Sequence, residues 1–173
     1  MGLFRGQRSS AGSAILIVLV ALVLLRPWES LDGLWRDEPP ASAVVRVTRV
    51  VDGDTVEVQL GAGEEDVRYI GVDTPETVKP DTPVQCFGPQ ASAFNHRLVE
   101  GRRVRLVFGA ERRDVYGRLL AYVYLDGRFV NAELVRRGLA RTLTIPPNDR
   151  FARRFERLQM AAARAGRGLW GRC

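Results

Sequence analysis

The sequence predicts a mainly β fold with helices: a five-stranded Greek-key barrel of the OB type that carries three helices, preceded by an apolar helix near the amino end. Three observations predict it. In each of five short runs, apolar residues alternate with polar residues, and this two-residue period is typical of a half-buried strand. Their order along the chain is three strands, a helix, two strands and two helices. A single uncharged apolar run, residues 11–25, stands apart from all of them.

The amino end has the features of a targeting or anchoring segment. Arg5 and Arg8 precede the apolar run, whose ~15 residues span ~22 Å as a helix, short of the roughly 30 Å hydrocarbon core of a bilayer. Extending the run to Trp28 favours a transmembrane signal-anchor over residues 11–28, with the basic segment 1–10 in the cytoplasm and the rest of the chain outside. The alternative is a cleaved signal peptide and a secreted protein, although no small-x-small site closely follows the run.

A linker and one folded domain follow. Residues 29–42 contain prolines and charges without periodicity, which indicates a linker, and residues 43–173 form the predicted domain. The net charge of +6 suits an anionic partner, either nucleic acid or an anionic membrane surface. A zinc site is disfavoured, because the sequence has no CxxC pair and its lone histidine, His96, lies in a predicted helix.

The first three predicted strands form a meander. Residues 43–51 and 55–60 alternate as strands do, residues 61–66 form a loop, and residues 67–72 are the third strand. Residues 73–89 are then a long proline-bearing loop. Long loops in compact domains are often functional, so this loop is a candidate part of a site.

A helix and two further strands come next. Pro89 suits the first turn of a helix, and Gly101 suits its carboxyl-terminal cap. Residues 103–108 and 119–125 are the fourth and fifth strands, and residues 111–118 form the turn that joins them.

Two helices complete the predicted domain. Asn131 is a helix-capping residue type at the start of a helix that stops at Gly138. Asn148 is placed to cap the last helix, which Gly166 ends. The apolar face of that helix consists of Phe151, Phe155, Leu158 and Ala162.

Carboxylates gather in two short stretches. The stretch "DGDT" holds Asp52 and Asp54, and "VRYIGVDTPE" ends with Asp73, Thr74 and Glu76. Carboxylate and threonine oxygens are hard ligands that suit Ca²⁺ or Mg²⁺. Strands two and three of a meander are antiparallel, so the start of one lies beside the end of the other and brings Asp54 near Asp73. Two adjacent carboxylates repel each other, and a cation removes that repulsion.

Two arginines complete the groups needed to hydrolyse a phosphodiester. Arg68 in the third strand and Arg118 in "DVYGR" would bind and neutralise a phosphate near the metal, while a further carboxylate takes a proton from water. Each feature also has a plainer interpretation: Asp52 and Gly53 as a hairpin turn, residues 73–76 as a turn, Arg68 as a solvated side chain and "DVYGR" as a hairpin turn. Their joint occurrence in this order favours a site.

Residues 44–170 resemble the staphylococcal nuclease-like (thermonuclease) family. The stretches "VVDGDTVEV", "VRYIGVDTPET", "FGPQASAF", "DVYGRLLAYVY", "NAELVRRGLA" and "GLW" match its motifs in order. The resemblance implies an OB-type barrel with three helices and a Ca²⁺-dependent endonuclease that hydrolyses phosphodiester bonds of DNA and RNA to 3′-phosphate ends. It implies nucleic-acid substrates and a monomer without an obligate protein partner.

The resemblance also implies a role for each site residue. The implied Ca²⁺ ligands are Asp54, Asp73 and the backbone carbonyl of Thr74, with Asp52 one shell further out. The implied catalytic residues are Glu76, which activates water, and Arg68 and Arg118, which stabilise the phosphate. Tyr116 falls where the family has a substrate-contacting tyrosine.

The chain departs from the family's secreted type member in one loop. Residues 77–88 carry Cys86 and lack a lysine-rich character, which puts the substrate contacts of this loop in doubt. Cys173 follows "GLW" and would lie near the loop if the carboxyl end packs back, so we expect a Cys86–Cys173 disulfide, with two free thiols as the alternative. The alternative function is a non-catalytic OB-type module that binds nucleic acid or protein and is tethered to a membrane. The complete set of predicted catalytic residues favours the enzyme.

Overall fold

The computed structural model describes residues 41–78 and 82–173. The predicted membrane segment, residues 11–28, and nearly all of the predicted linker lie outside this part of the chain. Among the helices of the described residues, none combines the length and the apolar character that a membrane crossing requires.

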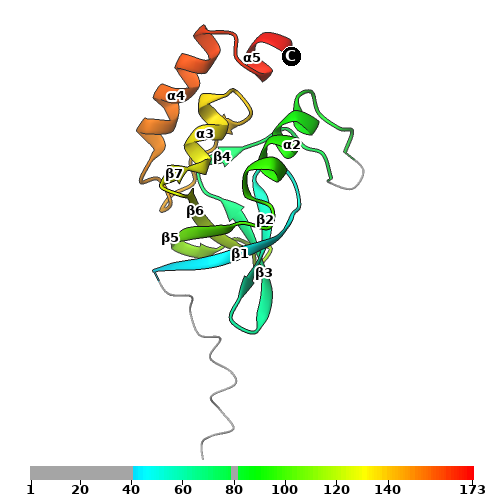
Figure 1. The fold of residues 1–173 in the computed structure, drawn as a ribbon. Helices are drawn as coiled ribbons and strands as arrows, with labels where there is room; N and C mark the ends of the chain where they lie inside the picture. The colour runs from blue at the N-terminus through cyan, green and yellow to red at the C-terminus, as the bar shows by residue number, and fades with distance from the viewer. Residues whose placement is uncertain (1–40, 79–81) are drawn as a thin grey trace, which may run out of the picture. The chain divides into compact units, whose positions relative to one another are not determined.

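Five strands close into a barrel (Figure 1). They are β1 (Ser42–Val50), β2 (Thr55–Leu60), β3 (Gly63–Tyr69), β5 (Arg103–Arg113) and β6 (Leu119–Leu125). Their order across the sheet is β3-β2-β1-β5-β6, all neighbours are antiparallel, and a parallel pairing of β3 with β6 closes the barrel. The predicted five-stranded barrel is therefore confirmed.

Three main helices accompany the barrel, as predicted. They are α2 (Gly88–Val99), α3 (Val130–Arg136) and α4 (Ala152–Arg164). Short elements that the sequence did not predict are β4 (Val72–Asp73), β7 (Arg128–Phe129), β8 (Arg141–Thr142) and α5 (Leu169–Arg172). In Figure 1, α3 and α4 lie side by side and α2 lies across from them, which agrees with the packing contacts between α3 and α4.

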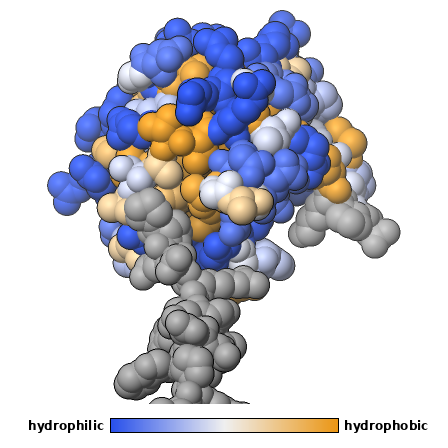
Figure 2. All heavy atoms as spheres, turned by 60° about the horizontal axis from the view of Figure 1, so that its bottom comes forward, coloured by the Kyte–Doolittle hydropathy of each residue, from blue (hydrophilic) through white to orange (hydrophobic). Residues whose placement is uncertain are grey.

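The alternating residues of the strands fill the barrel interior. Val47, Val56, Val58 and Val67 are completely buried, and Phe155 of α4 is buried against the ring of Phe129. On the face shown in Figure 2, hydrophilic residues make up most of the described surface, and hydrophobic residues gather in a central area and at the right edge. Burial of the apolar alternate residues is the main stabilising contribution to such a fold.

Several predicted strand boundaries were wrong. The fourth strand, predicted over residues 103–108 with a turn over 111–118, continues to Arg113 as β5, because Arg113 pairs with Leu119 of β6. Residues 61–66, predicted as a loop, contain a short turn and the first half of β3, because Glu64 pairs with Gln59 across the hairpin. The third strand ends at Tyr69 and not at residue 72, because Gly71 adopts a φ of +79° that interrupts the strand. A Cβ at Gly71 would lie 2.5 Å from the ring of Phe155, so this turn accepts only glycine.

The two predicted asparagine caps were also wrong. α3 begins at Val130 after Phe129, and no side chain caps it. The buried side chain of Asn131 instead accepts a hydrogen bond from the Val123 amide (2.9 Å) and donates one to the Ile70 carbonyl (2.9 Å). These contacts tie α3 to the barrel, and in a buried position they satisfy backbone groups that would otherwise lack a partner.

Asn148 likewise does not cap α4, which follows Phe151. Its side-chain oxygen accepts from the Glu111 amide (3.1 Å), and its side-chain nitrogen donates to the Glu111 carbonyl (2.9 Å). A Cβ at Gly109 would lie 2.3 Å from this side chain, so the asparagine can pack against the strand only because residue 109 is glycine. The asparagine fastens the segment before α4 to β5.

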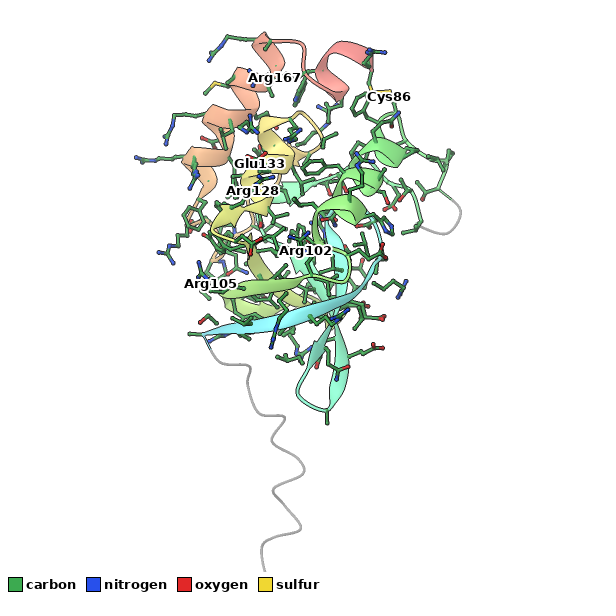
Figure 3. The ribbon with its side chains drawn as sticks, in the orientation of Figure 1. Cys86, Arg102, Arg105, Arg128, Glu133 and Arg167 are labelled. Atoms are coloured by element: carbon green, nitrogen blue, oxygen red, sulfur yellow. A yellow bond between two sulfur atoms is a disulfide. The ribbon has the colours of Figure 1, made fainter. Side chains whose placement is uncertain are left out.

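A disulfide joins Cys86 to Cys173, with an S–S distance of 2.07 Å and 87 residues of sequence separation (Figure 3). It ties the carboxyl end of the chain to the loop that precedes α2. Closing a loop of this size stabilises the folded state by about 4–5 kcal/mol in the chain-entropy model.

Candidate active site

The turn between β1 and β2 presents two carboxylates. Asp52 Oδ1 accepts a hydrogen bond from the Asp54 amide (2.9 Å), which closes the turn. Asn95, completely buried on α2, donates to the Asp52 carbonyl (3.0 Å) and holds the turn against the helix. A Cβ at Gly53 would lie 2.7 Å from Thr74 Oγ1, so the turn packs closely against the segment after β4. The two interpretations of Asp52 and Gly53, a turn and part of a site, are therefore compatible: the residues form a turn, and the turn carries the carboxylates.

Asp54 is buried and surrounded by donors. Its Oδ2 accepts from the Thr74 amide (2.7 Å) and from Thr74 Oγ1 (3.0 Å), and it lies 3.2 Å from Arg68 Nη1. Burial raises the pKa of the Asp54 carboxyl to about 7, against the opposing effect of Arg68, and the nearby Asp52 adds to the rise. The carboxyl is thus costly to ionise in the fold even with the Arg68 guanidinium beside it, and a further cation would reduce that cost.

Asp54→Asn is expected to stabilise the protein at pH 8 in the presence of a chelator, by about 1–3 kcal/mol. The pKa of Asp54 is raised in the folded state, so between pH ~4 and ~7 the folded state holds a proton that the unfolded state releases. Stability from this group is present below that window and is lost as the pH rises through it. Asparagine removes the cost of the buried charge, and Arg68 keeps three other acceptors, the carbonyls of Tyr69 and Val72 and the Asp73 carboxylate.

Urea unfolding of the two proteins at pH 4 and pH 8 measures this effect. Most of the gain should be lost at pH 4, where the wild-type carboxyl is protonated in the folded state and about half protonated in the unfolded state. A stability difference of the same size at both pH values would contradict the assigned cost of the Asp54 charge.

Arg68 draws two carboxylates together. The start of β2 lies beside the end of β3, because Thr55 pairs with Arg68. The Arg68 side chain is 14% exposed; its Nη2 lies 2.9 Å from Asp73 Oδ1 and its Nη1 lies 3.2 Å from Asp54 Oδ2. One guanidinium therefore contacts both acidic residues at this end of the barrel.

Glu76 lies on the loop after β4, and its backbone is clamped by Gln85. Glu76 Oε1 accepts from the amides of Thr77 (2.9 Å) and Val78 (3.0 Å). Gln85 Oε1 accepts from the Glu76 amide (3.0 Å), and the Gln85 amide donates to the Glu76 carbonyl (2.9 Å). Gln85 adjoins the disulfide residue Cys86, so the disulfide and the clamp hold the same segment. Sequence reasoning missed Gln85, because it acts across a loop that has no regular spacing.

Arg118 is held by Asp114 on the turn between β5 and β6. Asp114 Oδ2 lies 2.8 Å from Arg118 Nε and 2.7 Å from Nη2, and its Oδ1 accepts from the amides of Tyr116 and Arg118. The ring of Tyr116 is exposed and lies 5.3 Å from the Arg118 guanidinium carbon. Sequence reasoning placed Asp114 in the motif without a role, and the structure shows that it orients the arginine.

These side chains line one cleft of about 480 Å³. It brings together all the predicted metal, catalytic and substrate-contacting residues: Asp52, Asp54, Arg68, Asp73, Thr74, Glu76, Tyr116 and Arg118. Cys86 and Cys173 are not among the lining residues. A neighbouring groove of about 290 Å³ shares Arg68, Tyr116 and Arg118 with the cleft, and its apolar lining includes Leu143 and Ile145.

The donor groups of the cleft fit a hard cation. Within residues 41–78 and 82–173, no group of three or more His, Cys, Asp or Glu side chains is arranged as a metal site. The cleft instead offers the carboxylates of Asp54 and Asp73 and the backbone of Thr74, and the raised pKa of Asp54 marks a carboxylate that gains from a nearby cation. Oxygen donors of this kind suit Ca²⁺, which accepts water and substrate oxygens for the rest of its ligands.

Comparison with known proteins agrees with this geometry. A protein-family model described as "Staphylococcal nuclease homologue" matches residues 66–172. The chain is 41% identical over 166 residues to "Thermonuclease" of Staphylococcus intermedius, which covers 92% of this chain and 97% of the relative. It is 37% identical over 166 residues to "Thermonuclease" of Staphylococcus hyicus, covering 91% and 96% of the two chains. "Endonuclease YncB" of Bacillus subtilis is 41% identical over 130 residues, which are 74% of this chain and 62% of the relative.

Proposed function

The chain belongs to the family of staphylococcal nuclease homologues, and we propose that it is a Ca²⁺-dependent endonuclease that hydrolyses phosphodiester bonds of DNA and RNA to 3′-phosphate ends. One observation carries the proposal: Asp54, Arg68, Asp73, Glu76 and Arg118 line a single cleft. This set needs no residue from a second copy, and we propose that the enzyme acts as a monomer.

Arg68 and Arg118 bind the scissile phosphate. Their planar guanidinium groups match phosphate oxygens in pairs, and both are partly withdrawn from water, with 14% and 30% of their side chains exposed. Negative charge builds on the equatorial phosphate oxygens in the transition state, and these fixed cations stabilise it without having to reorganise.

Glu76 acts as the general base. Its carboxylate takes a proton from a water molecule, whose oxygen forms a bond to phosphorus as the bond to the 5′-oxygen breaks. The phosphate stays on the 3′-oxygen. The 5′-oxygen leaves with a proton from a donor other than Arg118, because a guanidinium does not readily release one.

Asp54, Asp73 and the Thr74 carbonyl would hold Ca²⁺, with Asp52 one shell further out. The ion supplies charge neutralisation at the phosphate when bound. Asp52 and Asn95 keep the turn that carries Asp54 in place. The apolar groove beside the cleft would accept the base next to the scissile phosphate, with Tyr116 at its edge.

We further propose that residues 11–28 anchor the enzyme in a membrane with the nuclease domain outside the cytoplasm; cleavage and secretion is the alternative. The Cys86–Cys173 disulfide supports this placement, since such bonds persist in oxidising compartments. Protease accessibility of the domain on intact cells tests the orientation, and digestion that requires cell lysis would contradict it.

Digestion of plasmid DNA and of a synthetic RNA by the full chain tests the enzymatic proposal. Cleavage should require Ca²⁺, should stop on addition of a chelator, and should return when excess Ca²⁺ is restored. End-group analysis should detect 3′-phosphates. Binding of nucleic acid without cleavage under all metal conditions would instead favour a non-catalytic binding module.

A further inference from the structure

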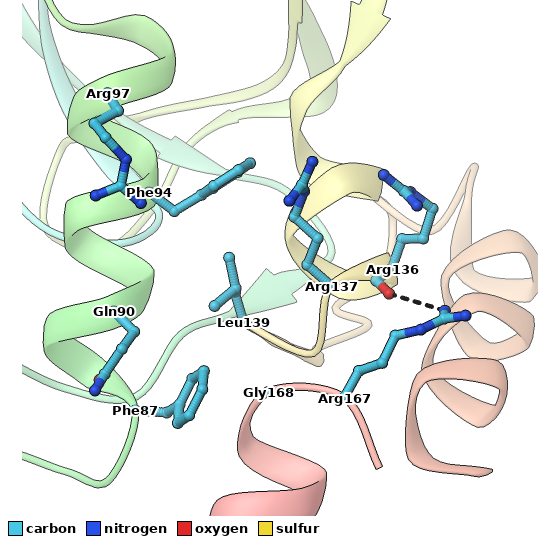
Figure 4. Close-up of a pocket in the computed structure, with 9 residues that line it drawn as sticks. All are labelled: Phe87, Gln90, Phe94, Arg97, Arg136, Arg137, Leu139, Arg167 and Gly168. Carbon is cyan, nitrogen blue, oxygen red and sulfur yellow. Dashed lines mark hydrogen bonds between the residues drawn. The ribbon is translucent and has the colours of Figure 1, made fainter. Parts of the chain in front are cut away.

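A second pocket, outside the catalytic cleft, is rich in arginine (Figure 4). It lies between α2, the carboxyl end of α3 and the turn before α5, and has a volume of about 550 Å³. Four arginines line it: Arg97, Arg136, Arg137 and Arg167. We call it the basic pocket.

The charge of the basic pocket is only partly neutralised within the fold. Glu133 pairs with Arg136 (2.7 Å) and with Arg137 (3.2 Å). Arg97 is exposed and makes no ion pair within the described residues, and Arg167 donates one hydrogen bond, to the Arg136 carbonyl (3.3 Å). Four guanidinium groups thus line the basic pocket, and the Glu133 carboxylate pairs with two of them. Such an excess of positive charge attracts an anionic ligand.

The pocket also has an apolar side. Phe87, Phe94 and Leu139 form this part of its lining, and the guanidinium of Arg137 lies 4.8 Å from the centre of the Phe94 ring. In Figure 4, Phe94 projects from α2 toward Arg137 at the end of α3, and Arg97 lies along α2. Arginines beside aromatic rings are the combination that holds the phosphates and bases of single-stranded nucleic acid. An anionic membrane surface has phosphates but no bases to stack on these rings, so the aromatic lining favours nucleic acid.

A hollow along α2 adjoins both the basic pocket and the catalytic cleft. Its lining includes His96, and it shares Val51 and Val78 with the cleft and Arg97 with the basic pocket. A strand that leaves the cleft along α2 would therefore meet Arg97 first and then the other arginines. This continuity distinguishes the basic pocket from a scattered set of surface charges.

We propose that the basic pocket binds the sugar-phosphate backbone of a single-stranded nucleic acid whose scissile phosphate occupies the catalytic cleft. The inference rests on the proposed nuclease function, since it assigns the pocket to a distal part of the same substrate. The enzyme would then bind long strands more tightly than short ones, and the difference would depend on residues far from the reacting atoms.

The test compares two charge-matched variants of the full chain. Arg97→Glu with Arg167→Glu alters the two pocket arginines that have no carboxylate partner among the residues that the structure describes. Arg153→Glu with Arg157→Glu makes the same charge change at exposed positions of α4 outside the pocket. Fluorescence anisotropy in chelator gives dissociation constants for single-stranded DNA from a dinucleotide to about 20 nucleotides, which spans the usual site sizes of OB folds.

The pocket variant should bind the longest strand at least about tenfold more weakly than wild type and the dinucleotide equally well, with the salt slope reduced by about 0.7 for each lost phosphate contact. The α4 variant should change neither by more than about twofold. Equal losses in the two variants, or a loss that begins at the dinucleotide, would overturn the proposal. So would weaker binding to phosphatidylserine vesicles with unchanged binding to DNA. The neutral pair Arg97→Gln with Arg167→Gln gives the same comparison if the reversed charges prevent folding.

Binding in chelator separates this inference from the proposed activity. Length-dependent binding that is lost in the pocket variant supports the basic pocket even if no Ca²⁺-dependent cleavage is found. Conversely, Ca²⁺-dependent cleavage together with length-independent binding would retain the nuclease and remove the pocket from its substrate site.

Discussion

Replacing Glu76 with glutamine is expected to lower kcat by a factor of about 10²–10⁴ while the dissociation constant for DNA changes by less than about threefold. Glutamine keeps the length of the side chain and an oxygen that accepts hydrogen bonds from the amides of Thr77 and Val78. The loop therefore keeps its shape, and Gln85 still clamps the backbone. The substituted side chain cannot take a proton from water, so the loss falls on the chemical step.

Single-turnover cleavage in Ca²⁺, with binding measured separately in chelator, resolves the two quantities. Glu156→Gln provides the matched control, since it makes the same substitution at an exposed position of α4 and should leave kcat unchanged. The limb of the wild-type pH profile that reports the base should also be absent from the Glu76→Gln protein. If the variant retains more than about a tenth of the wild-type kcat, Glu76 is not the base.

The barrel was predictable wherever one strand shows its own periodicity. Residues 55–60 and 119–125 were predicted with the bounds that β2 and β6 have, because apolar alternation begins and ends at turn-forming residues. The acidic run 61–66 has no apolar periodicity, and its last four residues form a strand only because β2 lies across from them. This part of β3 is a strand because it pairs with β2, and a local sequence pattern does not show which strands will pair.

The charged groups of the site could be predicted from the sequence. The residues that hold those groups in place could not. The carboxylates and arginines stand in short motifs, whereas Asn95 acts on Asp52 from 43 residues away. Asn131 and Asn148 have the chemistry of helix caps, but their side chains are used in long-range hydrogen bonds. An amide side chain makes similar bonds in either setting, so only the folded chain distinguishes a cap from a buried connection.

The contacts around Asp54 explain why the fold remains stable although it buries a carboxylate in the cleft. Asp54 is buried with a raised pKa, a state that costs stability and that persists because the barrel stabilises the fold elsewhere. Arg68 offsets part of the cost by contacting both Asp54 and Asp73. A bound cation would offset more. The same arrangement that lowers stability without metal therefore prepares the cleft for a cation and a phosphate.

Arg118→Ala is expected to lower kcat/KM by about 10²–10³, which corresponds to about 3–4 kcal/mol of lost transition-state stabilisation. Arg118 uses Nε and Nη2 to bind Asp114, and its Nη1 makes no hydrogen bond within the described residues, which leaves donors for a phosphate. Alanine removes this cation and also leaves the Asp114 carboxylate at the rim of the cleft, where it repels the substrate. Arg118→Lys should recover only a small part of the loss, because an ammonium group does not make the paired contacts of a guanidinium.

Asp114→Asn separates the two contributions to that loss. It keeps Arg118 but weakens the charged contact that orients it, so we expect a smaller fall in kcat, about tenfold, with little change in KM. Arg128→Ala, at an exposed arginine of β7, controls for the loss of one positive charge and should change kcat/KM by less than about twofold. If Arg118→Ala affected only KM and left kcat intact, the arginine would bind ground state and transition state equally. The proposed stabilisation of the developing charge would then have to come from Arg68 alone.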